Sequence, residues 1–275
     1  DFPYLNEAWV GRATYDYAYK YLLEVNISYT GSESFSPKNR FGFFPSAALG
    51  WVVSEEGFFK KNVPWMNLLK FRYSDGIVGS DKSADRWIYI NDFTKDNAGK
   101  IREDKIANSS ARWETARKRD LGVEIGLFNS FLKLTVDIFD EKRKDMLLTP
   151  RSTTFLIGNS FKNLNLGKLE KRGIEVEAEI NKTTSYLLNY HFKGMFGYND
   201  NRIIYKDDLP YAPEYKKDAG KPLGAQLNGV EVADGGYFTS VDDIHNYVSP
   251  IPLTNLNVGD YKFIDYSADG IINSN

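Results

Sequence analysis

Three oxygen-bearing side chains occupy alternate positions near residue 267 and could bind a metal ion. Asp265, Ser267 and Asp269 are followed by Gly270. This spacing matches the first half of a calcium-binding loop, in which alternate oxygens are ligands and glycine permits a sharp turn. The bidentate acid of such a loop would follow Asn275. Asp and Gly also suit an ordinary turn between two strands, so the sequence offers calcium as its one candidate cofactor and leaves a plain turn as the alternative.

A second group of residues, Glu175, Glu177 and Glu179, has the side chains used in acid–base catalysis. Alternate residues of a strand lie on one face, so a strand here places three like charges side by side. That arrangement suits a hydrated wall better than a catalytic pair. The two histidines, His191 and His245, are far apart in the sequence, and a lone histidine on a strand is more often structural. We therefore expect no catalytic residues and no enzyme activity.

The elements that would position such residues are strands, and the strongest strand pattern lies at residues 21–29. One parity of this segment is aliphatic with a tyrosine at each end, and the other is mostly polar. The apolar set is Tyr21, Leu23, Val25, Ile27 and Tyr29. A transmembrane barrel strand needs this layout, with an apolar band toward lipid, aromatic girdles at the interfaces and polar groups toward the lumen. Strands of a soluble β-sandwich also alternate apolar and polar residues, so the choice between barrel and sandwich depends on whether the pattern repeats with barrel-like spacing.

The pattern repeats with barrel-like spacing. Apolar and polar residues also alternate near 9–17, 43–53, 69–73, 121–127, 132–138, 174–180 and 186–198, which predicts about eight strands. Short turns are expected near 17–20, 128–131 and 181–185, and long links near 30–42, 80–110, 147–167 and from 200 onward. Bacterial barrels alternate short periplasmic turns with long extracellular loops in this way. The link at 54–66 falls on the short-turn side although it is not short, and it could hold a helical turn.

Composition limits the remaining classes of protein. Aromatic residues make up 15% of the 275 residues, as expected where aromatic girdles are built. No apolar run reaches the length of a transmembrane helix. The chain has no cysteine, which excludes disulfides and thiolate metal sites. A net charge of −2 gives no electrostatic case for nucleic acid, and the basic cluster at 117–119 is expected at a solvated strand end or against anionic lipid.

Several sequence blocks occur in one order along nearly the whole chain. They are Gly11-Arg12-Ala13-Thr14-Tyr15-Asp16-Tyr17 with Tyr21-Leu22-Leu23-Glu24-Val25-Asn26, Asn39-Arg40-Phe41-Gly42-Phe43-Phe44-Pro45-Ser46 with Leu49-Gly50-Trp51 and Ser54-Glu55-Glu56, Asn67-Leu68-Leu69-Lys70-Phe71-Arg72, Thr135-Val136-Asp137 with Phe139-Asp140, Lys171-Arg172-Gly173-Ile174-Glu175-Val176, and Gly259-Asp260-Tyr261-Lys262-Phe263-Ile264-Asp265 with Asp269-Gly270. Together they resemble the barrel of the SusC/RagA-type TonB-dependent outer-membrane transporters. The resemblance implies energised import of oligosaccharides or peptides across the outer membrane of a Gram-negative bacterium. It also implies a SusD-like surface lipoprotein as a lid, an N-terminal plug, and TonB as a partner.

The expected fold is all-β, a partial antiparallel transmembrane β-barrel. A plug, a domain ahead of it and a TonB-contacting segment are not recognisable in these residues, and large outer-membrane transporters have about 22 strands. We therefore expect residues 1–275 to be part of the barrel domain, with long extracellular loops near 80–110, 147–167 and 200–275. The alternatives are a complete eight-stranded barrel, whose lumen side chains would fill, a purely structural outer-membrane barrel, and a soluble secreted carbohydrate-binding β-sandwich module.

Aromatic side chains in the expected long loops are the candidate solute contacts, because glycans are commonly bound by aromatic faces together with polar groups. These residues are Trp87, Tyr89, Tyr205, Tyr211 and Tyr215. The alternative is that they pack the loops onto each other or onto the lipoprotein lid.

Overall fold

A computed structural model describes residues 3–97, 99–153, 157–183, 188–225, 233–247 and 255–263. The chain divides into two units, Asp1–Gly224 and Ala225–Asn275. Among the described residues, no helix is both long enough and apolar enough to cross a membrane.

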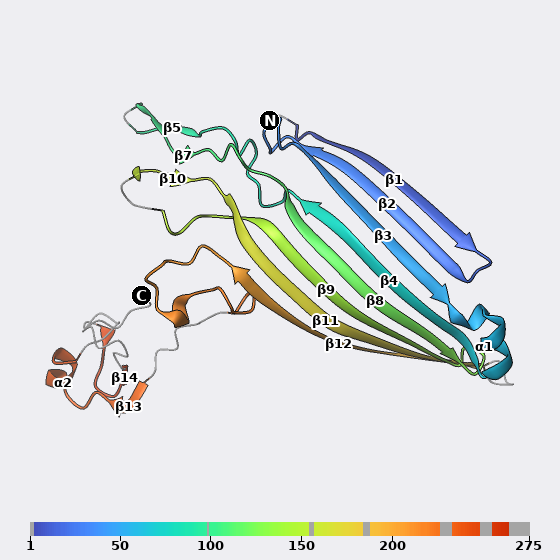
Figure 1. The fold of residues 1–275 in the computed structure, drawn as a ribbon. Helices are drawn as coiled ribbons and strands as arrows, with labels where there is room; N and C mark the ends of the chain where they lie inside the picture. The colour runs from blue at the N-terminus through green and yellow to red at the C-terminus, as the bar shows by residue number, and fades with distance from the viewer. Residues whose placement is uncertain are drawn as a thin grey trace. The chain divides into compact units, whose positions relative to one another are not determined.

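A single antiparallel sheet of eight long strands forms most of the first unit (Figure 1). Its strands, in order across the sheet, are β1 (Asn6–Tyr17), β2 (Tyr21–Ser32), β3 (Phe41–Val52), β4 (Met66–Ser80), β8 (Glu114–Leu127), β9 (Leu132–Leu148), β11 (Leu164–Thr183) and β12 (Asn189–Tyr205). Each strand pairs with the long strand that precedes it in the chain, so the sheet is an up-and-down meander. The prediction of about eight antiparallel strands is confirmed. The soluble sandwich is wrong, because these strands form one sheet where a sandwich needs two packed sheets.

The sheet is open in the part of the chain that the structure describes. β1 and β12 lie at its two edges, and no pairing joins them. The chain is therefore part of a barrel wall and does not close into an eight-stranded barrel. Within a bilayer both edges require further strands as partners, because an unpaired backbone group in lipid costs several kcal/mol.

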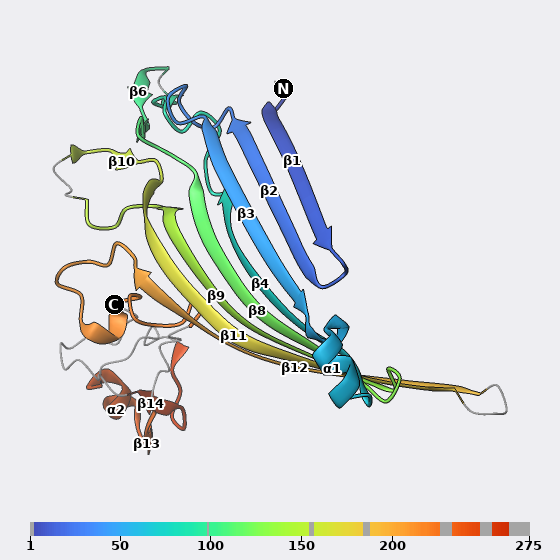
Figure 2. The same ribbon diagram turned by 45° about the vertical axis from the view of Figure 1, so that its right-hand side comes forward.

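Short turns and long links gather at opposite ends of the sheet (Figure 2). The turn end holds residues 18–20, residues 128–131, and the link 53–65 with a 3₁₀ turn, η1 (Val53–Glu55), and a helix, α1 (Gly57–Asn62), so the expected helical turn is confirmed. The other end holds the links 33–40, 81–113 and 149–163 and the part of the first unit that follows β12, residues 206–224. These links carry the short strands β5 (Phe93–Lys95), β6 (Ile101–Glu103), β7 (Lys105–Ile106) and β10 (Ser160–Phe161), and the segment after β12 carries η3 (Glu214–Lys216). β5 pairs with β6, and β10 pairs with β7.

Two of the tight turns use the left-handed backbone region without glycine. Ala18 and Tyr19 have φ of 52° and 57°, and residues 128–130 have φ between 53° and 62°. Neighbouring side chains stabilise both turns, because Asp16 Oδ1 accepts the Tyr19 N–H at 3.1 Å and Asn67 Oδ1 accepts the Ser130 N–H at 3.0 Å. The hydrogen bonds to Asp16 and Asn67 thus help to offset the strain of turns that lack the usual glycine.

The second unit has its own small core. It contains β13 (Ala233–Tyr237), α2 (Val241–His245) and β14 (Tyr261–Phe263), with β13 paired to β14. Phe238, Ile244 and Leu256 are buried together. Ser240 caps α2 by accepting the Asp243 N–H at 3.1 Å, and Asp243 Oδ1 also binds Lys262 Nζ at 2.8 Å. The contact with Lys262 and a hydrogen bond from the Thr239 N–H hold the pKa of the Asp243 carboxyl below its usual value.

Candidate functional site

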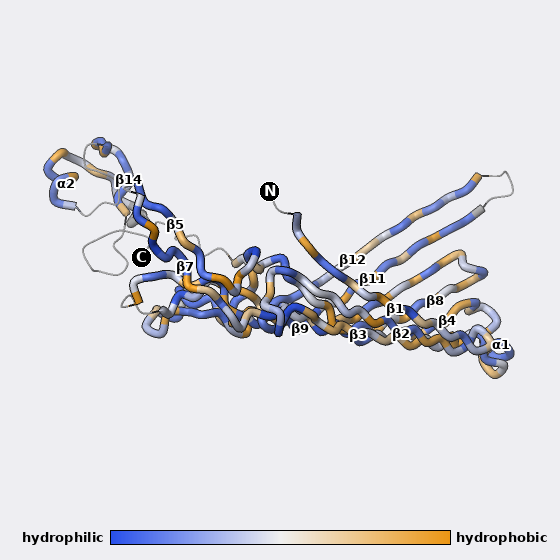
Figure 3. The backbone as a smooth tube through the Cα atoms, turned by 90° about the horizontal axis from the view of Figure 1, so that it is seen from above, coloured by the Kyte–Doolittle hydropathy of each residue, from blue (hydrophilic) through white to orange (hydrophobic). Residues whose placement is uncertain are grey.

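The two faces of the sheet have opposite character, and the strand register makes each face continuous. Paired residues across β2 and β3 include Leu23 with Leu49 and Val25 with Ala47. The same parity continues through the strands to the pair Val176 and Phe196 in β11 and β12. Figure 3 shows hydrophobic and hydrophilic residues alternating along the strands. We call the face with these apolar residues the apolar face and the other the polar face.

Aromatic rows bound the apolar face at both ends. Tyr17, Tyr21, Trp51 and Phe71 are partners in successive strands at the turn end, and Trp9, Tyr29 and Phe43 are partners toward the long links. Tyr21 and Tyr29 are about 27 Å apart along their strand, and a tilt of about 40° reduces this to about 20 Å across a membrane. An apolar band of about 25 Å between aromatic girdles is the pattern of an outer-membrane barrel. The apolar parity predicted from residues 21–29 therefore extends across the sheet toward the turn end, whereas nearer the long links the same parity carries Asp75, Arg119 and Asp140 in β4, β8 and β9.

Charged residues on the polar face form a connected group in the middle strands. Arg72 of β4 binds Glu124 Oε1 of β8 through Nε at 2.8 Å and Asp137 Oδ1 of β9 through Nη2 at 2.8 Å. Lys70 Nζ also lies 3.4 Å from Glu124 Oε1. Gly122 makes this crossing possible, because a Cβ there would lie 2.8 Å from Arg72 Nη2 and would clash with Asp137 Oδ1. Gly122 in the polar parity of β8 is the only trace of this contact in the strand's sequence pattern, and its partner Arg72 is identified by the register.

The glutamates of β11 lie on the same polar face. Glu175 is the register partner of Asp137, and Glu177 binds Lys193 Nζ of β12 at 2.7 Å. Glu179 Oε1 lies 3.6 Å from His191 Nδ1. The like charges are thus interleaved with basic side chains from the next strand. This geometry gives a wall of interleaved charges on the polar face, and the expectation that water hydrates it stays a prediction.

A packed cluster joins two of the long links and the end of β9 at the long-link end of the sheet. We call it the long-link platform, and its buried members are Phe35, Ile88, Ala111, Trp113 and Leu147. The Trp113 ring centroid lies 5.4 Å from that of Phe35 and 5.3 Å from that of Phe44 of β3. Trp113 Nε1 donates to the Arg40 carbonyl at 3.0 Å. The links 33–40 and 81–113 and the end of β9 are therefore one packed unit.

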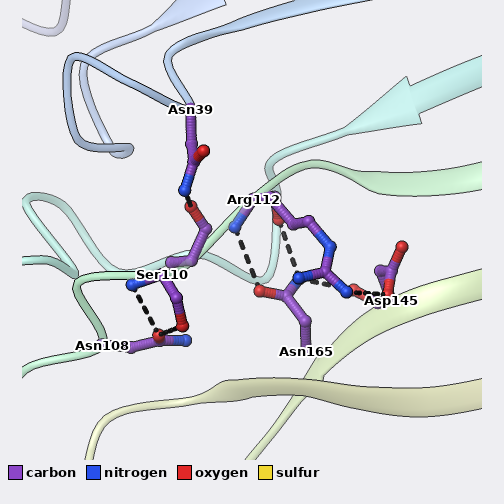
Figure 4. Close-up of polar contacts among 7 residues, drawn as sticks. Asn39, Asn108, Ser110, Arg112, Asp145 and Asn165 are labelled. Carbon is purple, nitrogen blue, oxygen red and sulfur yellow. Dashed lines mark hydrogen bonds and ion pairs between the residues drawn. The ribbon is translucent and has the colours of Figure 1, made fainter.

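Polar contacts extend the long-link platform (Figure 4). The Asn165 side chain accepts the Arg112 N–H at 3.0 Å and donates to the carbonyls of Arg112 at 2.8 Å and Asp145 at 2.7 Å. Arg112 Nη2 binds Asp145 Oδ1 at 2.6 Å, which raises the pKa of the guanidinium. Asn39 Nδ2 donates to the Ala111 carbonyl at 3.0 Å. These bonds satisfy backbone groups of the 81–113 link and the carbonyl of Asp145, which lies where the register between β9 and β11 is irregular.

An acidic clamp fixes the 149–163 link to the segment after β12. Asp207 accepts the N–H groups of Arg151 at 2.6 Å and Ser152 at 2.9 Å and the Ser152 hydroxyl at 2.7 Å. These hydrogen bonds, with that of the Ser152 hydroxyl foremost, lower the pKa of the Asp207 carboxyl. Asp218 binds Lys206 Nζ at 2.7 Å and Arg151 Nη1 at 3.0 Å, and its pKa is lowered as well, chiefly by Lys206.

A second carboxylate fixes the helical link at the turn end. Glu56 accepts the Tyr21 hydroxyl at 2.8 Å, Lys20 Nζ at 3.0 Å and Trp51 Nε1 at 3.4 Å. The Tyr21 and Lys20 hydrogen bonds lower the pKa of the Glu56 carboxyl. The link that carries α1 is thereby attached to the aromatic row of the apolar face.

The predicted solute contacts lie in different places. Trp87 and Tyr89 line one groove of about 440 Å³. Tyr205 ends β12, and Tyr211 is 99% exposed in the segment that follows. Tyr215 lies in η3, and its side chain is outside the described residues. The structure therefore brings Trp87 and Tyr89 together, and their role as solute contacts stays a prediction.

The predicted calcium ligands Asp265, Ser267 and Asp269 lie outside the described residues. Elsewhere, in the ranges the structure describes, no group of three or more His, Cys, Asp or Glu side chains has the arrangement of a metal site. Calcium binding stays a prediction.

Comparisons with known proteins agree with this geometry. The family model for the TonB dependent receptor-like β-barrel matches residues 6–271. TonB-dependent receptor P3 of Formosa agariphila is 30% identical over 214 residues, which cover 73% of this chain and 21% of that protein. TonB-dependent receptor SusC of Bacteroides thetaiotaomicron is 26% identical over 285 residues, which cover 97% of this chain and 27% of that protein. The chain thus spans about a fifth to a quarter of these relatives.

Among solved structures, the RagAB peptide importer in its open-open state aligns with a TM-score of 0.66 and 18% identity, over 74% of this chain and 22% of that one. At this identity the likeness concerns the fold, and it agrees with the open antiparallel sheet described above. With the family model covering nearly the whole sequence, the chain belongs to the TonB-dependent receptor β-barrel family.

Proposed function

We propose that the chain is part of the wall of an outer-membrane importer of a Gram-negative bacterium, driven through TonB. The observation that carries the proposal is the two-faced sheet, with an apolar band between aromatic rows on one face and paired charges on the other. The apolar face suits lipid, and the polar face suits a water-filled lumen. Membership of the TonB-dependent receptor β-barrel family supports the same conclusion, and we infer a transporter and no enzyme.

The proposed solute is an oligosaccharide or a peptide, taken up together with a SusD-like surface lipoprotein. The resemblance to SusC/RagA-type transporters supports both solute classes. The structural neighbour RagAB is a peptide importer, which favours keeping the peptide among the candidates. This chain spans about a quarter of the length of its relative SusC, and TonB and the plug would act through other parts of the receptor.

Calcium binding by Asp265, Ser267 and Asp269 is part of the proposal. Isothermal titration of the intact receptor with Ca²⁺, before and after substitution of these residues, tests it.

Cysteine labelling tests the membrane wall. The chain has no cysteine of its own, so single substitutions in β8 of the intact receptor give sites that are unique within this segment. Val123 lies on the apolar face between Phe71 and Val136, whereas Lys118 lies further along the same strand toward the long links. In native outer membranes a water-soluble maleimide should label Lys118→Cys and leave Val123→Cys unlabelled. Equal labelling of both sites would contradict the barrel wall.

Uptake tests the transport proposal separately. Deletion of the parent gene should abolish growth on one class of large solute, an oligosaccharide or a peptide, while growth on monosaccharides and amino acids stays normal. Complementation with the intact gene should restore growth. A deletion strain that grows normally on both classes would contradict the import function and leave the labelling result unaffected.

A further inference from the structure

Trp87 is held in a backbone conformation that a tryptophan rarely adopts. Its φ is 53°, in the left-handed region that is strained for a bulky side chain. The buried Lys162, whose side chain is 2% exposed, donates to the Trp87 carbonyl at 3.3 Å and pairs with Asp92 Oδ1 at 2.8 Å. The next residue, Ile88, is buried in the long-link platform. Strain of this kind persists only where the surroundings enforce it; in this molecule it occurs at tight turns, and in proteins generally it also clusters at ligand sites.

The Trp87 ring is also fixed in direction. The guanidinium carbon of Arg86 lies 4.4 Å from the ring centroid. Arg86 Nε pairs with Glu33 Oε1 at 2.8 Å, and its Nη2 donates to the Pro3 carbonyl at 2.8 Å. Even with this cation against it, Trp87 is 39% exposed. A ligand that stacks on the indole would meet an aromatic surface that is already ordered, which reduces the entropy lost on binding.

The groove beside Trp87 has the lining of a site for a neutral sugar. Its volume of about 440 Å³ falls within the usual range for small-molecule sites, roughly 300–1,000 Å³. Its polar lining includes Asn6, Glu7, Glu33 and Arg40, and its aromatic lining includes Tyr89 in addition to Trp87. Sugar hydroxyls both donate and accept, so an amide, carboxylates and a guanidinium can all bind them. Glu33 is already paired with Arg86, and Glu7 lies in the same lining as Arg40, so the groove offers no surplus of positive charge for a phosphate.

The register places this groove at the membrane end of the long links. Glu7, Gly31 and Phe41 line it and are partners across β1, β2 and β3. They share the parity of the apolar face and lie just beyond the aromatic row that contains Tyr29. The Phe41 and Tyr29 rings stack with centroids 4.9 Å apart. The groove therefore borders the lipid-facing surface and spans three strands.

From this position we propose that the groove binds a neutral sugar unit of a glycolipid in the outer leaflet. The inference rests on the proposed function, because it requires the apolar face to meet lipid and the long links to lie outside. The indole face stacks on the sugar ring, and Glu7, Glu33 and Arg40 bind its hydroxyls. The acyl chains of the glycolipid then lie along the apolar face next to Tyr29 and Phe41. Trp87 and Tyr89 thus contact a lipid-linked sugar and not a solute in the lumen.

Fluorine NMR of the intact receptor tests this site. The receptor is labelled with 5-fluorotryptophan and placed in phospholipid nanodiscs, and Trp87→Phe and Trp65→Phe assign two resonances. Adding lipopolysaccharide that carries its core sugars should shift the Trp87 resonance. Lipid A stripped of those sugars should not shift it, and the Trp65 resonance at the turn end should stay in place with both. Glu7→Gln keeps an acceptor but removes its charge, so it should weaken the apparent affinity for the sugar-bearing glycolipid by up to about tenfold, because a hydrogen bond to a charged group is about twice as strong as a neutral one.

Three results would overturn the proposal. The first is a Trp87 resonance that does not respond to the sugar-bearing glycolipid. The second is an equal response to stripped lipid A, which would indicate recognition of the phosphorylated disaccharide or the acyl chains of lipid A itself. The third is a response to soluble oligosaccharides in plain phospholipid nanodiscs, which would make Trp87 a solute contact. None of these depends on the labelling of Val123 and Lys118, so failure of this site and failure of the membrane-wall proposal are distinguishable.

Discussion

Replacing Trp113 with alanine should loosen the 81–113 link without unfolding the sheet. Trp113 is 9% exposed, and its ring contacts Phe35 and Phe44. Removing a buried tryptophan side chain typically costs about 3–5 kcal/mol. The lost aromatic pairs account for about 0.5–1.5 kcal/mol each, and the lost hydrogen bond to the Arg40 carbonyl for about 1 kcal/mol. Because these contacts belong to the long-link platform, the lost free energy lowers the cost of local opening of the links and leaves the stability of the sheet largely unchanged.

Limited trypsin digestion of the intact receptor in detergent measures this opening. The 81–113 link contains several lysines and arginines, including Lys95 and Arg102. When opening and closing are fast, cleavage follows the population of the open form. A loss of about 3–5 kcal/mol therefore raises the cleavage rate by about 10²–10³-fold or more, since every 1.4 kcal/mol is tenfold. Trp113→Phe, which keeps an aromatic ring but loses the hydrogen bond, should fall between wild type and Trp113→Ala.

Trp65→Ala is the matched control, because Trp65 is 50% exposed and lies at the turn end. It should change cleavage of the 81–113 link by less than about threefold, as most exposed substitutions alter stability by within about 0.5 kcal/mol. Unchanged cleavage of Trp113→Ala would refute the platform as a packed unit. Equal acceleration by Trp65→Ala would show that the effect is not local to it.

Three further predictions concern the sheet and the carboxylate contacts. Gly122→Ala should lower barrel stability by about 1–3 kcal/mol, because the added Cβ would meet the Arg72 and Asp137 side chains. Gly194→Ala should be neutral or stabilising, because the space around Gly194 is open. Heat-induced mobility shifts on gels measure the stability of both variants. The lowered pKa of Asp207 makes its clamp stable above the ordinary carboxyl pKa and weaker as the pH falls through the folded value. The protection factors of the 149–153 backbone amides, which are corrected for the intrinsic pH dependence of exchange, should therefore fall only in acid, and Asp207→Asn should remove that pH dependence. Glu56→Ala should release the α1 link, seen as faster proteolysis at the basic residues of α1, while Glu56→Gln should keep part of the contact with the Tyr21 hydroxyl.

The sheet and its two faces could be predicted from the sequence because alternation is a local property. Each strand, such as residues 21–29, carries its own division into an apolar and a polar parity, and the register then joins equal parities across neighbours. The links could be predicted only by length. Their φ-positive turns at Ala18 and Tyr19 lack glycine, so the usual turn signal is missing, and the hydrogen bond from the Tyr19 N–H to Asp16 becomes evident only in three dimensions.

The long-link platform and the Trp87 groove could not be predicted in this way, because their contacts join residues far apart in the chain. Trp87 was predicted as a binding residue by its type, but its strained backbone depends on Lys162, 75 residues further along. Trp113 gives no periodic signal, and its partners Phe35 and Phe44 belong to another link and another strand. The sheet brings these distant residues together, because its register places the ends of β2, β3, β4 and β8 on one side. Side chains of the links can pack only after those ends are fixed, so the site depends on a scaffold whose own pattern does not encode it.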